Sequence, residues 1–128
     1  MPTKPRRYRL GDLQLRIMKV LWDQGACGVG DVQEALGAGR LAYTTVATML
    51  RKMEDRGLVR HESEGRRFLY RAAVAPDAVT RSMADDILER LFDGSLANLM
   101  SHLLTTREVS RTELCELEKL IAERKKRL

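Results

Sequence analysis

The chain has few aromatic residues, few cysteines and no long apolar run. Of its 128 residues 44% are hydrophobic but only 5% are aromatic, so its core has to be built from aliphatic side chains. Packed helices accommodate such a core better than a β-sandwich does. No stretch approaches the roughly 20 apolar residues that span a bilayer, and no segment near the N-terminus is typical of a secretory signal. We therefore expect a cytoplasmic protein.

Residue types that carry catalysis or bind metals are also scarce. Cys27 and Cys115 lie far apart and neither belongs to a CxxC pair, so two reduced thiols are expected. His61 and His102 add too few ligands for a metal site. There is no Gly-rich phosphate loop and no nucleophile elbow. These absences argue against an enzyme, a metal, a cofactor and a small-molecule substrate.

Positive charge is concentrated in the first half of the chain. Residues 1–72 carry 14 Lys and Arg against 8 Asp and Glu, a net charge of +6, whereas residues 73–128 carry 9 against 10, a net charge of −1. A polyanion-binding domain joined to a non-binding domain would show this division. A solvated surface with randomly placed charges is the alternative interpretation.

The spacing of apolar residues predicts two helices at the start of the chain. The first occupies residues 11–25 and is apolar on nearly all sides. Residues 28–30 leave room for a very short strand. A second, short helix has Asp31 or Gly30 as its N-cap and ends at residues 37–39. Its inward-facing side chains are expected to be Val32, Ala35 and Leu36.

A third helix and a β-hairpin follow. The helix is predicted over residues 42–56, after which the apolar period changes from 3.6 to 2. This change indicates strands over residues 58–63 and 66–72, joined by a turn at residues 64–65. Helix, short helix, helix and hairpin is the order of a winged helix-turn-helix domain, which we place at residues 1–73. The apolar face of the third helix consists of Val46, Met49, Leu50 and Met53.

Residues 74–128 have the pattern of three amphipathic helices. This segment is too short to surround its own apolar faces, so pairing with a second copy is the economical way to bury them. Folding back onto the N-terminal domain as a monomer is the alternative. We expect a mainly α fold with a small β-hairpin, in which a C-terminal three-helix dimerisation arm makes a homodimer. The expected dimerisation residues are Ile87, Leu91, Leu99, Leu103, Leu114 and Leu117.

The third helix is the predicted reader of double-stranded DNA. A recognition helix enters the major groove with its N-terminal turns nearest the bases. On the face opposite the apolar stripe, short side chains come first and long cations follow, which suits base contacts and then phosphate contacts. An exposed helix face without a function is the alternative. The expected base-reading residues are Tyr43, Thr44, Thr45, Ala47 and Thr48, and the expected phosphate contacts are Arg51 and Lys52 together with Arg66 and Arg67 of the hairpin tip.

Several short segments carry a resemblance to a known family. They are Leu21–Trp22, Ala42–Leu50, Gly57–Val59, Gly65–Tyr70, Phe92–Ser95 and the pair Leu114 and Leu117. Together they span roughly residues 10–121, in register and without large gaps. They resemble the penicillinase-repressor (BlaI/MecI-type) family of winged-helix transcriptional repressors. The Tyr-Thr-Thr-Val run that opens the third helix is the most specific of these matches.

The resemblance implies a homodimeric repressor that binds a palindromic operator with TACA/TGTA-like half-sites and controls β-lactamase or cell-wall genes. It also implies that repression ends when a membrane-bound sensor metalloprotease, which detects β-lactam, cuts the dimerisation arm. The family's cut falls between an Asn and a Phe, and the matching pair here is His102 and Leu103. A winged-helix module that binds protein instead of DNA is the alternative function, because fold does not fix function.

Overall fold

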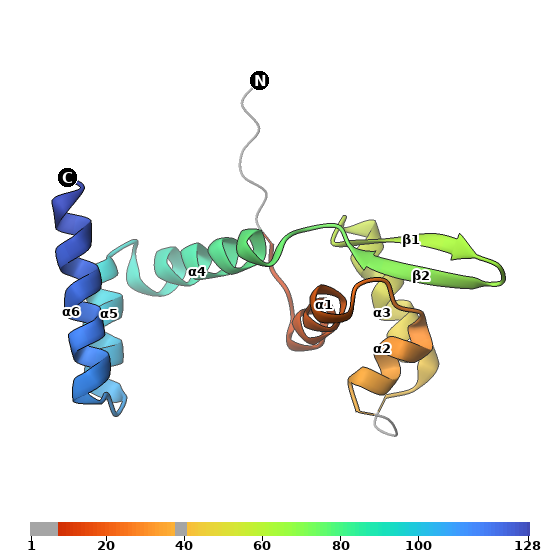
Figure 1. Ribbon diagram of the computed structural model, residues 1–128, viewed down its shortest axis with the longest axis horizontal. Coiled ribbons are helices and arrows are strands. Elements are labelled where there is room, and N and C mark those ends of the chain that lie inside the picture. Colours follow the sequence, from red (N-terminus) through yellow and green to blue (C-terminus); the bar gives the residue numbers. More distant parts are fainter. Residues whose placement is uncertain (1–7, 38–40) are drawn as a thin grey trace. The chain divides into compact units, whose positions relative to one another are not determined.

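The structure is a computed structural model that describes residues 8–37 and 41–128 (Figure 1). The chain divides into two compact units, one extending to Ala84 and one formed by Asp85–Leu128. The predicted fold class, mainly α with a small β-hairpin, is confirmed. The elements are α1 (Asp12–Gln24), α2 (Val29–Ala35), α3 (Tyr43–Asp55), β1 (Val59–Glu64), β2 (Arg67–Ala72), α4 (Pro76–Phe92), α5 (Leu96–Thr106) and α6 (Arg111–Lys126).

An aliphatic core holds the first unit together. α1 packs against α2 and β2, and α2 packs against α3, so the three helices and the hairpin share one interior. The predicted apolar stripe of α3 lies in this core, with Met49 half-buried at its edge. The core is therefore aliphatic, as the low aromatic content predicts, and Tyr70 is the one aromatic residue among the described buried residues of the cluster. The buried residues of this core are Ile17, Met18, Leu21, Cys27, Val32, Val46, Leu50, Met53, Leu58, Val59 and Tyr70.

α2 begins earlier than predicted. Its N-cap is Gly28, whose N–H donates to the Asp31 carboxylate at 2.9 Å. A carboxylate in the first turn stabilises a helix N-terminus, and here it acts from the N3 position and not as the cap itself. The strand expected at residues 28–30 is therefore absent. The strand-like contact lies one residue earlier, where Cys27 forms an antiparallel bridge with Tyr70 of β2.

The inner face and the end of α2 also bear on the predictions. Val32 is buried and Leu36 is half-buried, as expected, but Ala35 is exposed and lines an open pocket. The prediction that placed Ala35 inside is wrong because the short helix turns only one narrow stripe toward α1 and α3. The predicted helix end at residues 37–39 lies partly outside the described residues, and so do residues 1–7 of the predicted domain.

The hairpin forms as predicted, with its turn displaced by one residue. β1 and β2 are antiparallel and His61 pairs with Tyr70. The turn lies at Gly65 and Arg66, whereas residues 64–65 were expected, and Gly65 has a φ of +64°. Glycine adopts this left-handed conformation without the strain that a Cβ would cause. The displacement extends β1 to Glu64.

The second unit consists of the later part of α4 together with α5 and α6. Serine hydroxyls cap both following helices: Ser95 accepts from the N–H of Asn98, and Ser110 accepts from the N–H of Glu113, each at 3.1 Å. All residues of α5 and α6 are described, and none of them is buried. Among the described residues, moreover, no helix has the length and apolar content needed to cross a membrane.

Candidate nucleic-acid interface

α3 presents the face that the sequence predicted as the DNA reader. Its buried side chains, Val46, Leu50 and Met53, recur at helical spacing and hold one side of the helix in the core. Thr44 and Thr48 lie on the opposite side and are exposed. The sequence therefore folds this segment as an anchored helix with a solvent-facing row of short side chains.

The five predicted base-reading residues lie within the first two turns of α3. All are exposed except Ala47, which is half-buried, and Tyr43 keeps 55% of its surface accessible. Short side chains at these positions let the helix backbone come close to base edges in a major groove. The shallow depression on this face is lined by Thr44, Thr45, Thr48, Met49 and Lys52.

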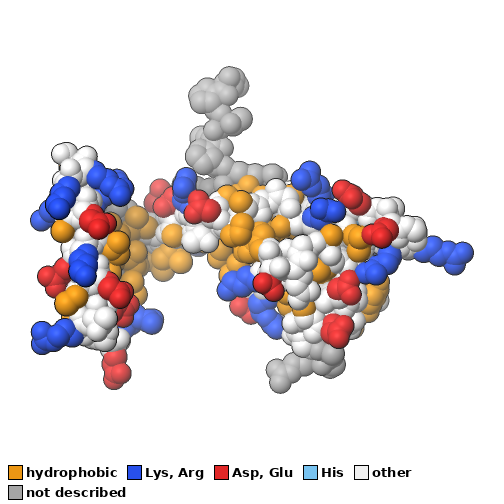
Figure 2. All heavy atoms as spheres, viewed as in Figure 1, with side chains coloured by type: hydrophobic (Ala, Val, Ile, Leu, Met, Phe, Trp, Pro, Cys, Tyr) orange, Lys and Arg blue, Asp and Glu red, His pale blue; other side chains and the backbone are white. Residues whose placement is uncertain are grey.

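Basic side chains lie beyond this row. Arg51 and Lys52 are exposed on the next turn of α3. Arg66 is exposed at the turn of the hairpin, and Figure 2 shows a basic side chain extending from that tip. Exposed cations placed beside a recognition helix are suited to contact phosphates.

Arg67 differs from its neighbour because it is engaged within the chain. Its Nη2 donates to Asp31 Oδ2 at 2.8 Å, and the same oxygen accepts the Gly28 N–H. The Gly28 N–H and, to a smaller extent, the Arg67 guanidinium lower the pKa of Asp31. By its sequence context Asp31 suits only a helix cap, and no local pattern signals a contact across 36 positions.

The hairpin, residues 59–72, is called the wing from here on, and it also contacts the end of α3. The Nδ1 atom of His61 lies 2.7 Å from both carboxylate oxygens of Glu54, and the His61 N–H donates to Glu54 Oε2 at 3.1 Å. The His61 ring lies 4.4 Å from that of Phe68 and 5.5 Å from that of Tyr70, centroid to centroid. Phe68 and Tyr70 thus share one face of β2.

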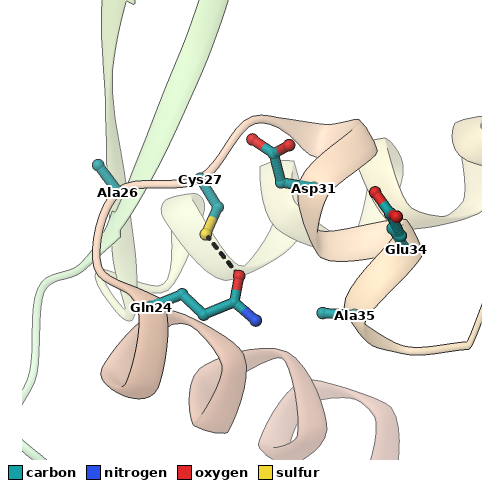
Figure 3. A pocket seen from close by; sticks show the side chains of 6 residues that line it. All are labelled: Gln24, Ala26, Cys27, Asp31, Glu34 and Ala35. Atoms are coloured by element: carbon teal, nitrogen blue, oxygen red, sulfur yellow. Dashed lines mark hydrogen bonds between the residues drawn. The ribbon is translucent and has the colours of Figure 1, made fainter.

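A pocket lies beside the start of α2, near the end of α1 (Figure 3). The Cys27 thiol donates to Gln24 Oε1 at 3.8 Å. Burial is the main cause that raises the pKa of Cys27, which disfavours the reactive thiolate form. Over residues 8–37 and 41–128 no group of three potential metal ligands comes together. The pocket is lined by Gln24, Ala26, Cys27, Asp31, Glu34 and Ala35.

Apolar side chains remain accessible along α4, α5 and α6, and Figure 2 shows hydrophobic atoms on the surface of this segment. Two of the predicted dimerisation residues, Leu99 and Leu117, are half-buried. The other four are exposed, and the accessible fractions are 46% for Ile87, 71% for Leu91, 36% for Leu103 and 39% for Leu114. Leu96, Leu104, Leu120 and Ile121 are exposed as well.

The pair matched to the family's cleavage position lies inside α5. His102 and Leu103 are both exposed, and the His102 ring lies 5.7 Å from the ring of Phe92. The bond between them is therefore part of a folded helix.

These features together define a class of protein. α2 and α3 form a helix-turn-helix whose second helix exposes its N-terminal turns, and the antiparallel wing follows directly. This is the winged helix-turn-helix domain of DNA-binding transcriptional regulators. The chain belongs to the penicillinase repressor family, which it matches over residues 10–123. It is accordingly a transcriptional repressor of the BlaI type, in a family that acts by binding and not by catalysis.

Two curated relatives are similar over most of their length. The penicillinase repressor of Bacillus licheniformis is 26% identical over 120 residues, which cover 93% of this chain and 94% of that protein. The transcriptional regulator BlaI of Mycobacterium tuberculosis is 33% identical over 118 residues, which cover 90% of this chain and 84% of that protein.

Solved structures include similar folds. The solution structure of monomeric B. licheniformis BlaI in complex with the blaP half-operator aligns with a TM-score of 0.48 at 26% identity, over 57% of this chain and 90% of that one. The crystal structure of a possible transcriptional regulator for arsenical resistance aligns with a TM-score of 0.50 at 20% identity, over 76% of this chain and 88% of that one. The latter likeness concerns the fold alone.

Proposed function

We propose that this chain is a homodimeric repressor that reads a palindromic DNA operator with α3 and contacts the duplex backbone with the wing. The observation that carries the proposal is the exposed face of α3, on which short hydroxyl side chains precede two cations. Thr44 and Thr48 lie one turn apart on this face, so each can meet a different base pair along the major groove. Tyr43, Thr45 and Ala47 flank them.

Phosphate contacts supply most of the affinity in this proposal. Arg51 and Lys52 reach the backbone from the third turn of α3, and Arg66 reaches it from the wing. Such contacts set the register of the protein on the duplex but carry no sequence information themselves. The net charge of +6 on residues 1–72 favours the approach of this unit to DNA.

The proposed homodimer is supported by the second unit. α5 and α6 bury none of their residues, and Leu91 and Leu120 expose 71% and 62% of their surfaces. Two-fold pairing of this unit buries the same apolar face on both copies. It also supplies two α3 helices, which two half-sites of a palindrome require.

We further propose that the repressor controls β-lactamase or cell-wall genes and that a cut in α5 relieves repression. The names of the two relatives, penicillinase repressor and BlaI, support the first part. A cut between His102 and Leu103 would separate all of α6 from the DNA-reading unit. Because this bond lies inside α5, the helix has to open before a protease can bind it. The proposed protease is a membrane-bound sensor metalloprotease.

Footprinting on the DNA upstream of the chain's own coding region tests operator binding. We expect two protected half-sites of the TACA/TGTA type, related by a dyad. A dimer that contacts roughly six to ten phosphates should lose about 10³- to 10⁵-fold in affinity between about 50 and about 200 mM salt. A duplex of the same composition with shuffled half-sites is the control. Equal affinity for both duplexes would contradict the proposal.

Mass spectrometry of the protein from cells treated with β-lactam tests the cut. We expect a fragment that ends at His102, formed at the time the regulated genes are expressed. An intact chain in cells whose operator has become free would refute proteolytic relief and leave DNA reading by α3 standing.

A further inference from the structure

The Arg67 guanidinium lies over the first turn of α2. There it meets the Asp31 carboxylate at 2.8 Å, and Asp31 in turn accepts the Gly28 N–H at 2.9 Å. A Cβ placed on Gly28 would overlap the Arg67 Nη2 atom. The absence of a side chain at position 28 therefore creates the space that the guanidinium occupies. These three residues are called the wing latch from here on.

The main chain attaches the wing to the same segment. The Cys27 N–H donates to the Tyr70 carbonyl at 3.0 Å, and the Tyr70 N–H donates to the Cys27 carbonyl at 2.7 Å. Arg67 is three positions nearer the hairpin tip than Tyr70 and directly follows Arg66. The wing latch is thus the outer of two attachments along β2, and it lies beside the turn.

We propose that Arg67 is a positioning residue that holds the tip of the wing against α2, so that Arg66 reaches the DNA backbone. This inference rests on the proposed DNA binding. Both adjacent arginines at the hairpin tip are exposed to solvent, but they have different tasks here because the charge of Arg67 is paired with that of Asp31. Arg67 makes no phosphate contact itself. It holds the wing in the position from which Arg66 contacts a phosphate.

Gly28→Ala tests this assignment without changing any charge. The new methyl group displaces the flexible end of Arg67 from Asp31 and leaves both arginines in the chain. Alanine accepts the backbone conformation of Gly28, whose φ is −75°. Displacement lowers operator affinity if the latch positions Arg66. If Arg67 contacts a phosphate directly, its release from Asp31 leaves affinity unchanged or raises it.

The full-length protein is titrated onto the duplex found by footprinting, with fluorescence anisotropy as the readout. Gly28→Ala, Arg66→Ala and Arg67→Ala are each expected to weaken binding by about tenfold. Adding Arg66→Ala to Arg67→Ala is expected to cause no further loss. The slope of log affinity against log salt should fall by about 0.9 for each phosphate contact removed, equally in Arg66→Ala and in the double variant. Arg71→Ala removes an exposed charge from the same strand and should bind within about twofold of the unchanged protein.

Two results would overturn the inference. One is a Gly28→Ala variant that binds like the unchanged protein. The other is a double variant whose loss is the product of the two single losses, about hundredfold, with both salt slopes adding. All titrations are made at a temperature below the onset of the thermal transition of the least stable variant, so that unfolding does not enter.

A failure of the proposed function is seen separately, as equal binding of the unchanged protein to operator and shuffled duplex. The latch is then tested by hydrogen exchange at the Tyr70 amide. Exchange should be faster in both Gly28→Ala and Arg67→Ala, since each frees the outer part of the wing. Unaltered exchange in both variants would show that the pair does not hold the wing.

Discussion

Leu91→Ala tests whether the C-terminal unit joins two chains. Leu91 is 71% exposed, so its truncation removes little packing within one chain, and alanine preserves the helix. Burying a whole leucine contributes about 1.5–3 kcal/mol, so covering its exposed 71% contributes about 1–2 kcal/mol per chain and about 2–4 kcal/mol per two-fold dimer. The dissociation constant of the dimer should therefore rise by about 30- to 900-fold.

Sedimentation equilibrium over a concentration series measures this change. Leu128→Ala is the matched control, because Leu128 is 94% exposed at the end of the chain and lies outside α6. We expect the control to dimerise like the unchanged protein. A Leu91→Ala dimer of undiminished affinity would refute the assignment of this face, and a monomeric unchanged protein at micromolar concentration would refute the dimer itself.

Three further sets of substitutions probe the first unit. Arg51→Ala is expected to weaken binding to every duplex alike, whereas Thr44→Ala or Thr48→Ala should lower the ratio of affinities for operator and shuffled duplex. An altered site preference in Arg51→Ala would contradict the phosphate contact assigned to Arg51. Leu50→Ala removes a side chain with 0% exposure and should lower the free energy of unfolding by about 2–5 kcal/mol in urea denaturation. A loss below about 1 kcal/mol would mean that Leu50 is not in the core. The Gly28 N–H and the Arg67 guanidinium lower the pKa of Asp31 in the folded protein. The ionised Asp31 carboxylate therefore stabilises the fold fully at a pH above the ordinary pKa of an aspartate, and this stabilisation is lost as the pH falls through the lowered pKa. Asp31→Asn should therefore narrow the difference in thermal midpoint between pH 7 and pH 3, and an unchanged difference would argue against the latch.

Elements whose burial follows a simple period were predictable from the sequence. The stripe of Val46, Leu50 and Met53 marks α3 and its exposed face because one side of a helix must be apolar to pack. Serine caps were predictable for a similar reason, since Ser95 satisfies a free N–H within three residues of itself. These features are local, and local chemistry suffices to set them.

Contacts between distant segments were not predictable. Arg67 looked like a free cation at a hairpin tip because its partner, Asp31, lies on another element. The start of α2 was misplaced for a related reason. By residue type a helix can start at Gly28, Gly30 or Asp31. In the structure α2 starts after Gly28, and the preceding residue, Cys27, is bridged to Tyr70 of β2. Tertiary hydrogen bonds therefore decided what propensity left open.

α5 and α6 have no buried residues, and this has a consequence for the stability of the proposed homodimer. If this segment acquires its interior only from a second copy, its folding and its association are one equilibrium, and its melting temperature rises with protein concentration. A cell with few copies would then hold chains whose C-terminal helices are frayed and open to general proteolysis, while a cell with many copies would protect them. The cellular concentration of the protein would then affect how strongly it represses, independently of any inducer.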